Sequence, residues 1–299
     1  MAGEPAVSVE RLTKHYGSHR GVEDISFAVD RGEILGFLGP NGSGKTTVIR
    51  TLMGLIRPSS GDARILGRPV NGSPAVREQV GYVPGRLELL TRMTVREYLL
   101  HVAALRRLDL TSSIVELADR FDLDLNASIA SLSKGNKQKV GVVQAVMHRP
   151  TVLILDEPTS GLDPIVQKQF EALITDMRNR GTALLLSSHV MAEVEVVADR
   201  VAILDSGRLR LLESMSDLRS RIERSLEFEF STPIDVSALS AVEGVTSIRA
   251  TDRRVSCTIV GSEKPLLAAV VQLDVVAVTS HEPSLEDVFM AVTRGGSSA

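Results

Sequence analysis

The sequence predicts a mainly parallel α/β fold followed by a smaller α+β unit. Three observations indicate this organisation. Strand-like and helix-like segments alternate over residues 1–215, which is typical of a parallel sheet covered by helices. A glycine-rich loop at residues 39–46 joins a buried strand to a helix. Beyond residue 215 the order becomes strand, helix, strand, strand, helix, strand, so we expect a second domain over residues 216–299.

The first expected elements are strands. Residues 7–10 and 25–29 alternate apolar and polar side chains, as half-buried strands do. Residues 34–38 form the continuous apolar run of a buried parallel strand. A helix is expected to follow the glycine-rich loop over residues 46–55 and to end near Gly54.

The middle of the chain predicts a mainly helical subdomain over residues 86–149. Thr94 with Glu97, and Ser113 with Glu116, match the capping box that begins a helix. Strands and helices then alternate again. The expected strands cover residues 152–155, 183–187 and 201–204, and the expected helices cover residues 133–149, 163–181 and 190–199.

The C-terminal part predicts a ferredoxin-like α+β domain, because its elements follow the order β-α-β-β-α-β. A charged helical linker is expected over residues 216–224, and a further helix begins at Pro283. The expected elements between them cover residues 226–230, 235–242, 245–249, 255–260, 265–273 and 275–278.

The composition is that of an ordinary globular chain, with 43% hydrophobic and 24% charged residues. The formal net charge of −3 does not supply the basic field that nucleic-acid binding needs, so no nucleic-acid partner is expected. The one cysteine, Cys257, cannot form an intrachain disulfide, which fits a reducing compartment. No apolar run reaches the roughly 18–20 residues of a membrane-spanning helix. We therefore expect a cytoplasmic location.

The glycine-rich loop matches the phosphate-binding pattern G-x-x-x-x-G-K-[ST], in the strand-to-helix context that the pattern requires. Its glycines let successive N–H groups point at an anion, and the helix N-terminus adds a partial positive charge. Lys45 is expected to reach the β- and γ-phosphates of a nucleotide, and the Thr46 hydroxyl is expected to bind Mg²⁺. The predicted nucleotide-binding residues here are Gly39, Pro40, Asn41, Gly42, Ser43, Gly44, Lys45, Thr46 and Thr47.

A pair of acidic residues follows the buried strand at residues 152–155. Asp156 occupies the strand end where phosphate-loop enzymes hold Mg²⁺. Glu157 is then positioned to polarise a water molecule for attack on the γ-phosphate. The simpler alternative is that the two carboxylates cap a helix or form salt bridges.

Further motifs follow in a fixed order. Leu132-Ser-Lys-Gly-Asn136 precedes the acidic pair, and Ser160-Gly-Leu-Asp163 and His189 come after it. This order resembles the ATP-binding subunit of an ABC transporter over residues 5–215, and above all the drug- and antibiotic-export type. The resemblance implies an ABC-type P-loop NTPase fold, with ATP and Mg²⁺ as cofactors and ATP hydrolysis coupled to export. It also implies a homodimer bound to a separate transmembrane permease on the inner face of the cell membrane.

The resemblance also implies roles for individual residues. Tyr16 corresponds to the aromatic residue that stacks on adenine; the simpler and less favoured alternative is a packed tyrosine at a strand end. Ser133 and Gly135 correspond to the signature groups that contact the γ-phosphate of ATP held by the other subunit. Asp163 corresponds to the aspartate that links the two sites, and it can cap a helix at the same time. His189 corresponds to the histidine that contacts the γ-phosphate.

Two departures from the family pattern concern the site. Gly85 stands where the family usually has a glutamine that touches Mg²⁺ and the water molecule, so the metal role of this loop is in doubt. Lys134 and Asn136 replace the glycine and glutamine of the commoner signature. Because Ser133 and Gly135 are retained, a working site is still expected.

Two other functional classes stay open. The chain could be a soluble ABC ATPase that remodels a protein or nucleic-acid partner, although translation-type members usually carry two such domains in one chain. It could also be a binding module without activity, but Glu157 and His189 argue against that.

Overall fold

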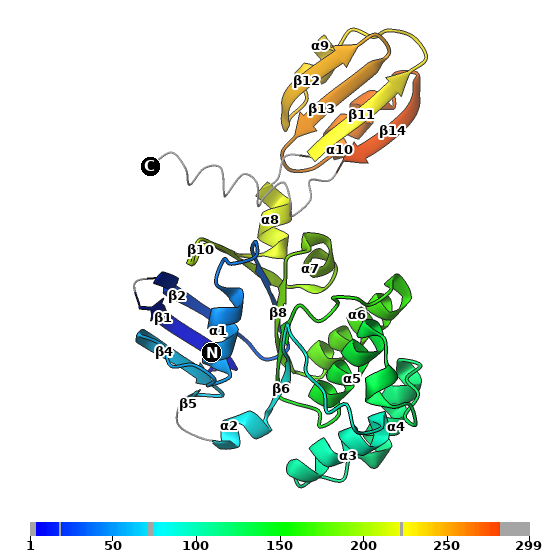
Figure 1. Cartoon of the computed structure of the whole chain (residues 1–299). Coiled ribbons are helices and arrows are strands. Elements are labelled where there is room, and N and C mark those ends of the chain that lie inside the picture. Colours follow the sequence, from blue (N-terminus) through cyan, green and yellow to red (C-terminus); the bar gives the residue numbers. More distant parts are fainter. Residues whose placement is uncertain (1–3, 18, 71–73, 222–223, 282–299) are drawn as a thin grey trace. The chain divides into compact units, whose positions relative to one another are not determined.

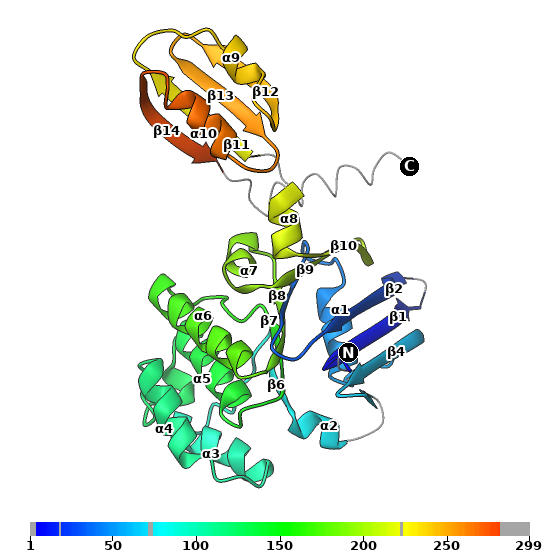
Figure 2. The same cartoon turned by 180° about the vertical axis from the view of Figure 1, so that it is seen from behind.

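The computed structural model describes residues 4–17, 19–70, 74–221 and 224–281, shown in Figure 1 and, from behind, in Figure 2. The chain divides into two compact units, residues 1–212 and 213–299, which are described separately below. The helix expected from Pro283 lies outside the described residues. No helix within the described ranges has the length and apolar character needed to span a membrane.

A six-stranded sheet with the order β10-β9-β3-β8-β7-β6 organises the first unit. Its strands are β3 (Ile34–Leu38), β6 (Val80–Val83), β7 (Val152–Asp156), β8 (Ala183–Ser188), β9 (Arg200–Asp205) and β10 (Arg208–Ser214). The strands from β9 to β6 pair in parallel, which confirms the predicted parallel sheet. The carboxyl ends of β3, β7 and β8 therefore meet at one edge, where Asp156 pairs in register with Ser187.

A second, antiparallel sheet with the order β2-β1-β4-β5 was not predicted as a separate layer. Its strands are β1 (Val7–Tyr16), β2 (His19–Val29), β4 (Ser60–Ile65) and β5 (Arg68–Pro69). Both long strands extend beyond the predicted segments. Arg11 and Asp24 have positive φ angles of 46° and 53°, and the β1–β2 register shifts between Val9 and Leu12. These irregularities interrupt the alternation of apolar and polar residues, so the sequence pattern shows only part of each strand.

Helix α1 (Lys45–Leu52) packs against both sheets. Its buried Val48 and Ile49 belong to a single apolar cluster that also contains side chains of β1, β2, β3, β7 and β8. Phe27 and Phe37, from the two sheets, lie with their ring centroids 5.3 Å apart in this cluster. Because α1 begins where the glycine-rich loop ends, this packing also fixes the loop.

The other helices of this unit are α2 (Pro74–Glu78), α3 (Val95–Leu105), α4 (Thr111–Arg120), η1 (Ile129–Ser131), α5 (Lys134–Val146), α6 (Pro164–Asn179) and α7 (Met191–Val197). The capping box at Thr94 is confirmed. The one predicted at Ser113 is wrong, because α4 already begins at Thr111, whose N–H donates to Asp109. The Ser113 hydroxyl instead donates to the carbonyl oxygen of Met147 at 2.8 Å.

The second unit holds an antiparallel sheet with the order β12-β13-β11-β14. After α8 (Met215–Arg221), its elements are β11 (Arg224–Phe230), α9 (Ser237–Ser240), β12 (Val245–Thr251), β13 (Arg254–Ile259), α10 (Lys264–Val270) and β14 (Val275–His281). Its own apolar core includes Phe228, Phe230 and Leu266. The predicted order of strands and helices is thus observed.

Candidate nucleotide-binding site

The glycine-rich loop lies between β3 and α1 and curls tightly. Ser43 N donates to the Pro40 carbonyl oxygen at 3.1 Å. Gly42 and Gly44 have φ angles of 84° and 108°, a region that side chains disfavour. A Cβ atom on Gly44 would also overlap the side chain of Val22. Glycine is therefore required at residue 44 both for backbone conformation and for close approach.

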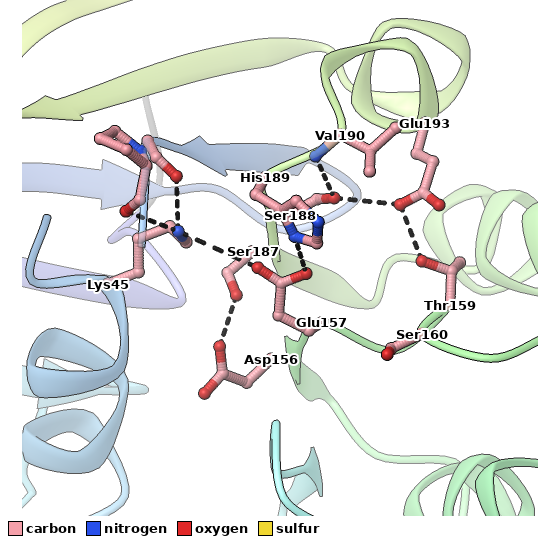
Figure 3. Close-up of polar contacts among 12 residues, drawn as sticks. Lys45, Asp156, Glu157, Thr159, Ser160, Ser187, Ser188, His189, Val190 and Glu193 are labelled. Atoms are coloured by element: carbon pink, nitrogen blue, oxygen red, sulfur yellow. Dashed lines mark hydrogen bonds and ion pairs between the residues drawn. The ribbon is translucent and has the colours of Figure 1, made fainter. Parts of the chain in front are cut away.

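Lys45 projects from the start of α1 back over the loop. Its Nζ donates to the carbonyl oxygens of Gly39 at 2.6 Å and Pro40 at 3.3 Å, and it lies 3.9 Å from Oε1 of Glu157 (Figure 3). The side chain is only 6% exposed. Burial lowers the pKa of Lys45, and the nearby carboxylates of Glu157 and Asp156 partly oppose this change. The site therefore holds a desolvated cation in position for an anionic ligand.

Asp156, at the end of β7, is buried and bound by two hydroxyl groups. Ser187 Oγ donates to its Oδ1 at 2.6 Å, and Thr46 Oγ1 donates to its Oδ2 at 3.2 Å. Hydroxyl and carboxylate oxygens are the ligands that Mg²⁺ prefers, and this ion usually binds few protein groups besides substrate phosphates and water. Thr46 and Asp156 thus fit the chemistry of a Mg²⁺ site.

Glu157 lies in the turn directly after β7 and faces His189, which follows β8. Nδ1 of His189 lies 2.6 Å from Oε2 of Glu157 (Figure 3). Glu157 has a φ of 52°, unusual for a non-glycine residue, and its N–H donates to the Ser187 carbonyl oxygen at 3.1 Å. Such backbone strain often occurs at functional sites. The geometry holds an acceptor carboxylate and an imidazole together beside Lys45.

Lys45, Thr46, Asp156 and Glu157 line a cavity of about 580 Å³. Tyr16 is 46% exposed and is one of its lining residues. Its ring lies close to Gly21, because a Cβ atom on Gly21 would be 2.9 Å from Cε2 of Tyr16. The lining residues are Tyr16, Gly21, Asn41, Gly42, Ser43, Gly44, Lys45, Thr46, Thr47, Arg50, Tyr82, Pro84, Gly85, Arg86, Asp156 and Glu157. Most of the predicted nucleotide-binding residues therefore converge on one cavity.

Six predicted site residues lie outside this lining: Gly39, Pro40, Ser133, Gly135, Asp163 and His189. Gly39 and Pro40 accept hydrogen bonds from Lys45, and His189 contacts Glu157, so these three lie directly beside lining residues. Ser133 is the N-cap of α5 and accepts from Asn136 N at 3.2 Å. Gly135 lies against the backbone of Gly161, since a Cβ atom there would be 2.7 Å from the Gly161 carbonyl oxygen. Asp163 caps α6 and accepts from Ile165 N and Val166 N at 3.0 Å each. Ser133, Gly135 and Asp163 thus form a second area, beside the loop that follows β7.

Three residues in or beside the cavity were not predicted from the sequence: Ser187, Arg50 and Tyr82. Ser187 holds Asp156, yet its only sequence signal is a polar residue at the end of an apolar strand. Arg50 and Tyr82 line the cavity from α1 and β6. Burial and the Asp156 carboxylate raise the pKa of Tyr82. Recognising these three residues required the order of the strands in the sheet.

A phosphate loop lies at the carboxyl edge of a parallel sheet, and a buried Asp and a half-buried Glu lie at the end of β7, which is separated from β3 by β8. This arrangement defines a nucleoside-triphosphate-binding protein of the P-loop class. The family model described as ABC transporter matches residues 22–160. The chain is 33% identical over 296 residues to the bacitracin transport ATP-binding protein BcrA of Bacillus licheniformis, covering 95% of this chain and 96% of that protein.

Solved structures agree with this similarity. An ATP-binding subunit of an ABC transporter is 32% identical, with a TM-score of 0.67 over 72% of this chain and 92% of that one. A dimeric bacterial ABC transporter cassette shares the fold at 20% identity, with a TM-score of 0.63 over 70% of this chain and 98% of that one. This chain therefore belongs to the ATP-binding proteins of ABC transporters, in which ATP hydrolysis is coupled to transport.

Proposed function

We propose that two copies of this chain hydrolyse Mg²⁺-bound ATP and thereby drive export through a separate membrane permease. The observation that carries the proposal is the convergence of Lys45, Thr46, Asp156 and Glu157 on one cavity. Similarity to BcrA, a bacitracin transport protein, over nearly the whole chain supports export of an antibiotic-like substrate. In this arrangement the chain is peripheral, on the inner face of the membrane.

The contacts within the site support the following roles for its residues. The loop N–H groups and Lys45 bind the β- and γ-phosphates, while Tyr16 stacks on the base. Thr46 and Asp156 hold Mg²⁺, which neutralises charge on the phosphates when bound. Glu157 accepts a proton from the attacking water, because it is the partly exposed carboxylate nearest Lys45. His189 orients Glu157 by donating its Nδ1–H to the carboxylate, and in the doubly protonated form of the ring Nε2 can also donate to the γ-phosphate.

The homodimer is proposed because one copy does not bring all the expected groups to its own cavity. Ser133 and Gly135 lie outside the lining, at the N-terminus of α5. A serine hydroxyl and free N–H groups at a helix N-terminus suit a phosphate. If these groups contact the nucleotide of the partner copy, each site is complete only in the dimer. Asp163 then lies between the two sites. ATP can favour closure only through its higher affinity for the closed pair.

The two units have separate proposed roles. Residues 1–215 form the ATP-binding domain, whose segment 86–149 transmits motion to the permease. Residues 216–299 form an accessory or regulatory domain. We assign this domain to the ferredoxin-like class, supported by its element order and by its strand order β12-β13-β11-β14.

A Glu157→Gln variant tests the ATPase assignment. It should bind ATP as the parent does but lose turnover by about 100-fold or more, since a general base contributes about 10²–10⁴-fold. Binding can be followed with a fluorescent ATP analogue and turnover by phosphate release. Turnover at the parent rate would show that Glu157 is not the base.

The transport assignment is tested with inside-out vesicles that contain this chain and a multi-span membrane protein that co-purifies with it. Export in the cell corresponds to ATP-dependent accumulation in these vesicles, with bacitracin as the first probe. The Glu157→Gln variant is the control. Full ATPase activity without association with any membrane protein would instead favour a soluble remodelling ATPase.

A further inference from the structure

Glu193, on α7, joins the two loops that carry Glu157 and His189. Its Oε2 accepts from Thr159 Oγ1 at 2.7 Å and from Ser188 Oγ at 3.0 Å (Figure 3). Thr159 lies two residues after Glu157, and Ser188 directly precedes His189. A single carboxylate oxygen therefore connects the turn after β7 to the turn after β8.

The direction of these hydrogen bonds matters. Ser188 Oγ also accepts from Val190 N at 2.9 Å, so the hydroxyl accepts on one side of His189 and donates to Glu193. A hydroxyl has one proton, and Glu193 fixes where that proton points. With the proton directed at Glu193, the lone pairs of Ser188 Oγ remain available to accept from Val190 N. Both neighbours of His189 in the chain are thus positioned by one acceptor.

The surroundings make this acceptor difficult to replace. Thr159 and Ser188 are 7% and 1% exposed, so water has little access to their hydroxyl groups. Without Glu193 the two buried donors would lose their acceptor, which disfavours the present loop conformation. The register of β7 with β8 aligns the strands only as far as Asp156 and Ser187. Beyond that point, the Glu193 contacts are a second connection between the turns.

We propose that Glu193 is a positioning residue for ATP hydrolysis, which holds the 2.6 Å contact between His189 and Glu157 in its productive geometry. Glu193 acts through Ser188 and Thr159 and does not itself touch the nucleotide. The proposal rests on the proposed roles of Glu157 and His189. Because neither Thr159 nor Ser188 lines the nucleotide cavity, loss of Glu193 should lower the rate of turnover and leave ATP binding unchanged.

The test compares Glu193→Ala and Glu193→Gln by steady-state ATPase assays on the full chain. Small misplacements of reacting groups cost up to about 100-fold in rate, so Glu193→Ala should lower kcat by about tenfold or more. The KM for ATP should stay within about twofold of the parent value. Glu193→Gln keeps an acceptor oxygen and should retain most of the parent kcat. The exposed Glu116 on α4 provides a matched control, Glu116→Ala, with parental kcat.

The decisive measurement repeats Glu193→Ala in a His189→Ala background. If Glu193 acts by positioning His189, adding Glu193→Ala to the His189→Ala variant should change the residual kcat by less than about twofold. If Glu193→Ala lowers kcat by the same factor in the parent protein and in the His189→Ala variant, the proposal is overturned. A raised KM with unchanged kcat would overturn it too, as would a Glu193→Gln variant as impaired as Glu193→Ala.

Two further variants keep the proposal testable if Glu193→Ala does not fold. Thr159→Val and Ser188→Ala each remove one hydrogen bond, and each should lower kcat with KM retained and with no added effect when His189 is absent. Failure of the underlying function is recognised separately. If Glu157→Gln and His189→Ala leave turnover intact, the proposed catalytic roles fail. If both reduce turnover and Glu193→Ala remains fully additive, only the role of Glu193 fails.

Discussion

Replacing Gly85 with glutamine should lower the Mg²⁺ concentration at which ATP turnover is half-maximal. A Cβ atom on residue 85 would lie 3.2 Å from Oδ2 and 3.3 Å from Cγ of Asp156, within reach of the proposed metal site. Gly85 is not among the residues with positive φ, so its backbone accepts a side chain. Replacing glycine at a compatible position favours folding by about 0.4–1 kcal/mol, which offsets the close contact with Asp156. The variant should therefore fold.

The expected size of the effect follows from a contact between the glutamine amide oxygen and the Mg²⁺ ion beside Asp156. A polar contact to a charged group contributes about 1.5–3 kcal/mol. Since about 1.4 kcal/mol corresponds to a tenfold change in an equilibrium constant, the half-saturating Mg²⁺ concentration should fall by about tenfold or more. The assay is steady-state ATP hydrolysis at saturating ATP, titrated with free Mg²⁺.

The matched control is Gly85→Ala, which adds the Cβ atom without the amide. It should follow the Mg²⁺ titration of the parent protein. If the glutamine variant follows the same curve as the alanine variant and the parent, a side chain at residue 85 does not reach the metal. The reasoning from the proximity of Gly85 to Asp156 would then be refuted.

The other predictions concern Lys45 and Gly135. Lys45→Met should abolish binding of a fluorescent ATP analogue yet raise the melting temperature of the nucleotide-free protein, because burial lowers the pKa of Lys45 and disfavours its ammonium form. The folded state binds this proton less tightly than the unfolded state, so the penalty acts at neutral pH and disappears as pH rises past the ordinary value of 10.5. The gain in melting temperature of Lys45→Met over the parent protein should therefore shrink as pH rises. A melting temperature for Lys45→Met equal to or below that of the parent at neutral pH would contradict this prediction. Gly135→Ala should suppress turnover but leave ATP binding intact, since the added Cβ atom would lie 2.7 Å from the Gly161 carbonyl oxygen, outside the cavity. Loss of ATP binding in that variant would contradict the proposal that Gly135 acts on the partner's nucleotide.

Elements with regular local patterns were predicted well. The apolar runs of β3, β7 and β8 were recognised, as were the cap at Thr94 and the helix that begins after Asp163. Elements with interrupted patterns were not. The short β6 contains a glycine, and the irregular register of β1 hides half of that strand. At Ser113 a capping pattern was present, but Asp109 accepts from the N–H of Thr111, where the helix begins, and the Ser113 hydroxyl donates to the Met147 carbonyl oxygen.

The amino-acid sequence by itself determined the local chemistry of this protein: a phosphate loop between a strand and a helix, and an acidic pair after a buried strand. These features depend on residues adjacent in the chain, so spacing alone identifies them. The tertiary structure decided which distant groups meet. Ser187 reaches Asp156, His189 reaches Glu157, and Gly85 lies against Asp156 because β8, β7 and β6 are neighbours in one parallel sheet. Hydrophobic periodicity indicates that a strand is buried, but it carries no information about which strand lies beside it.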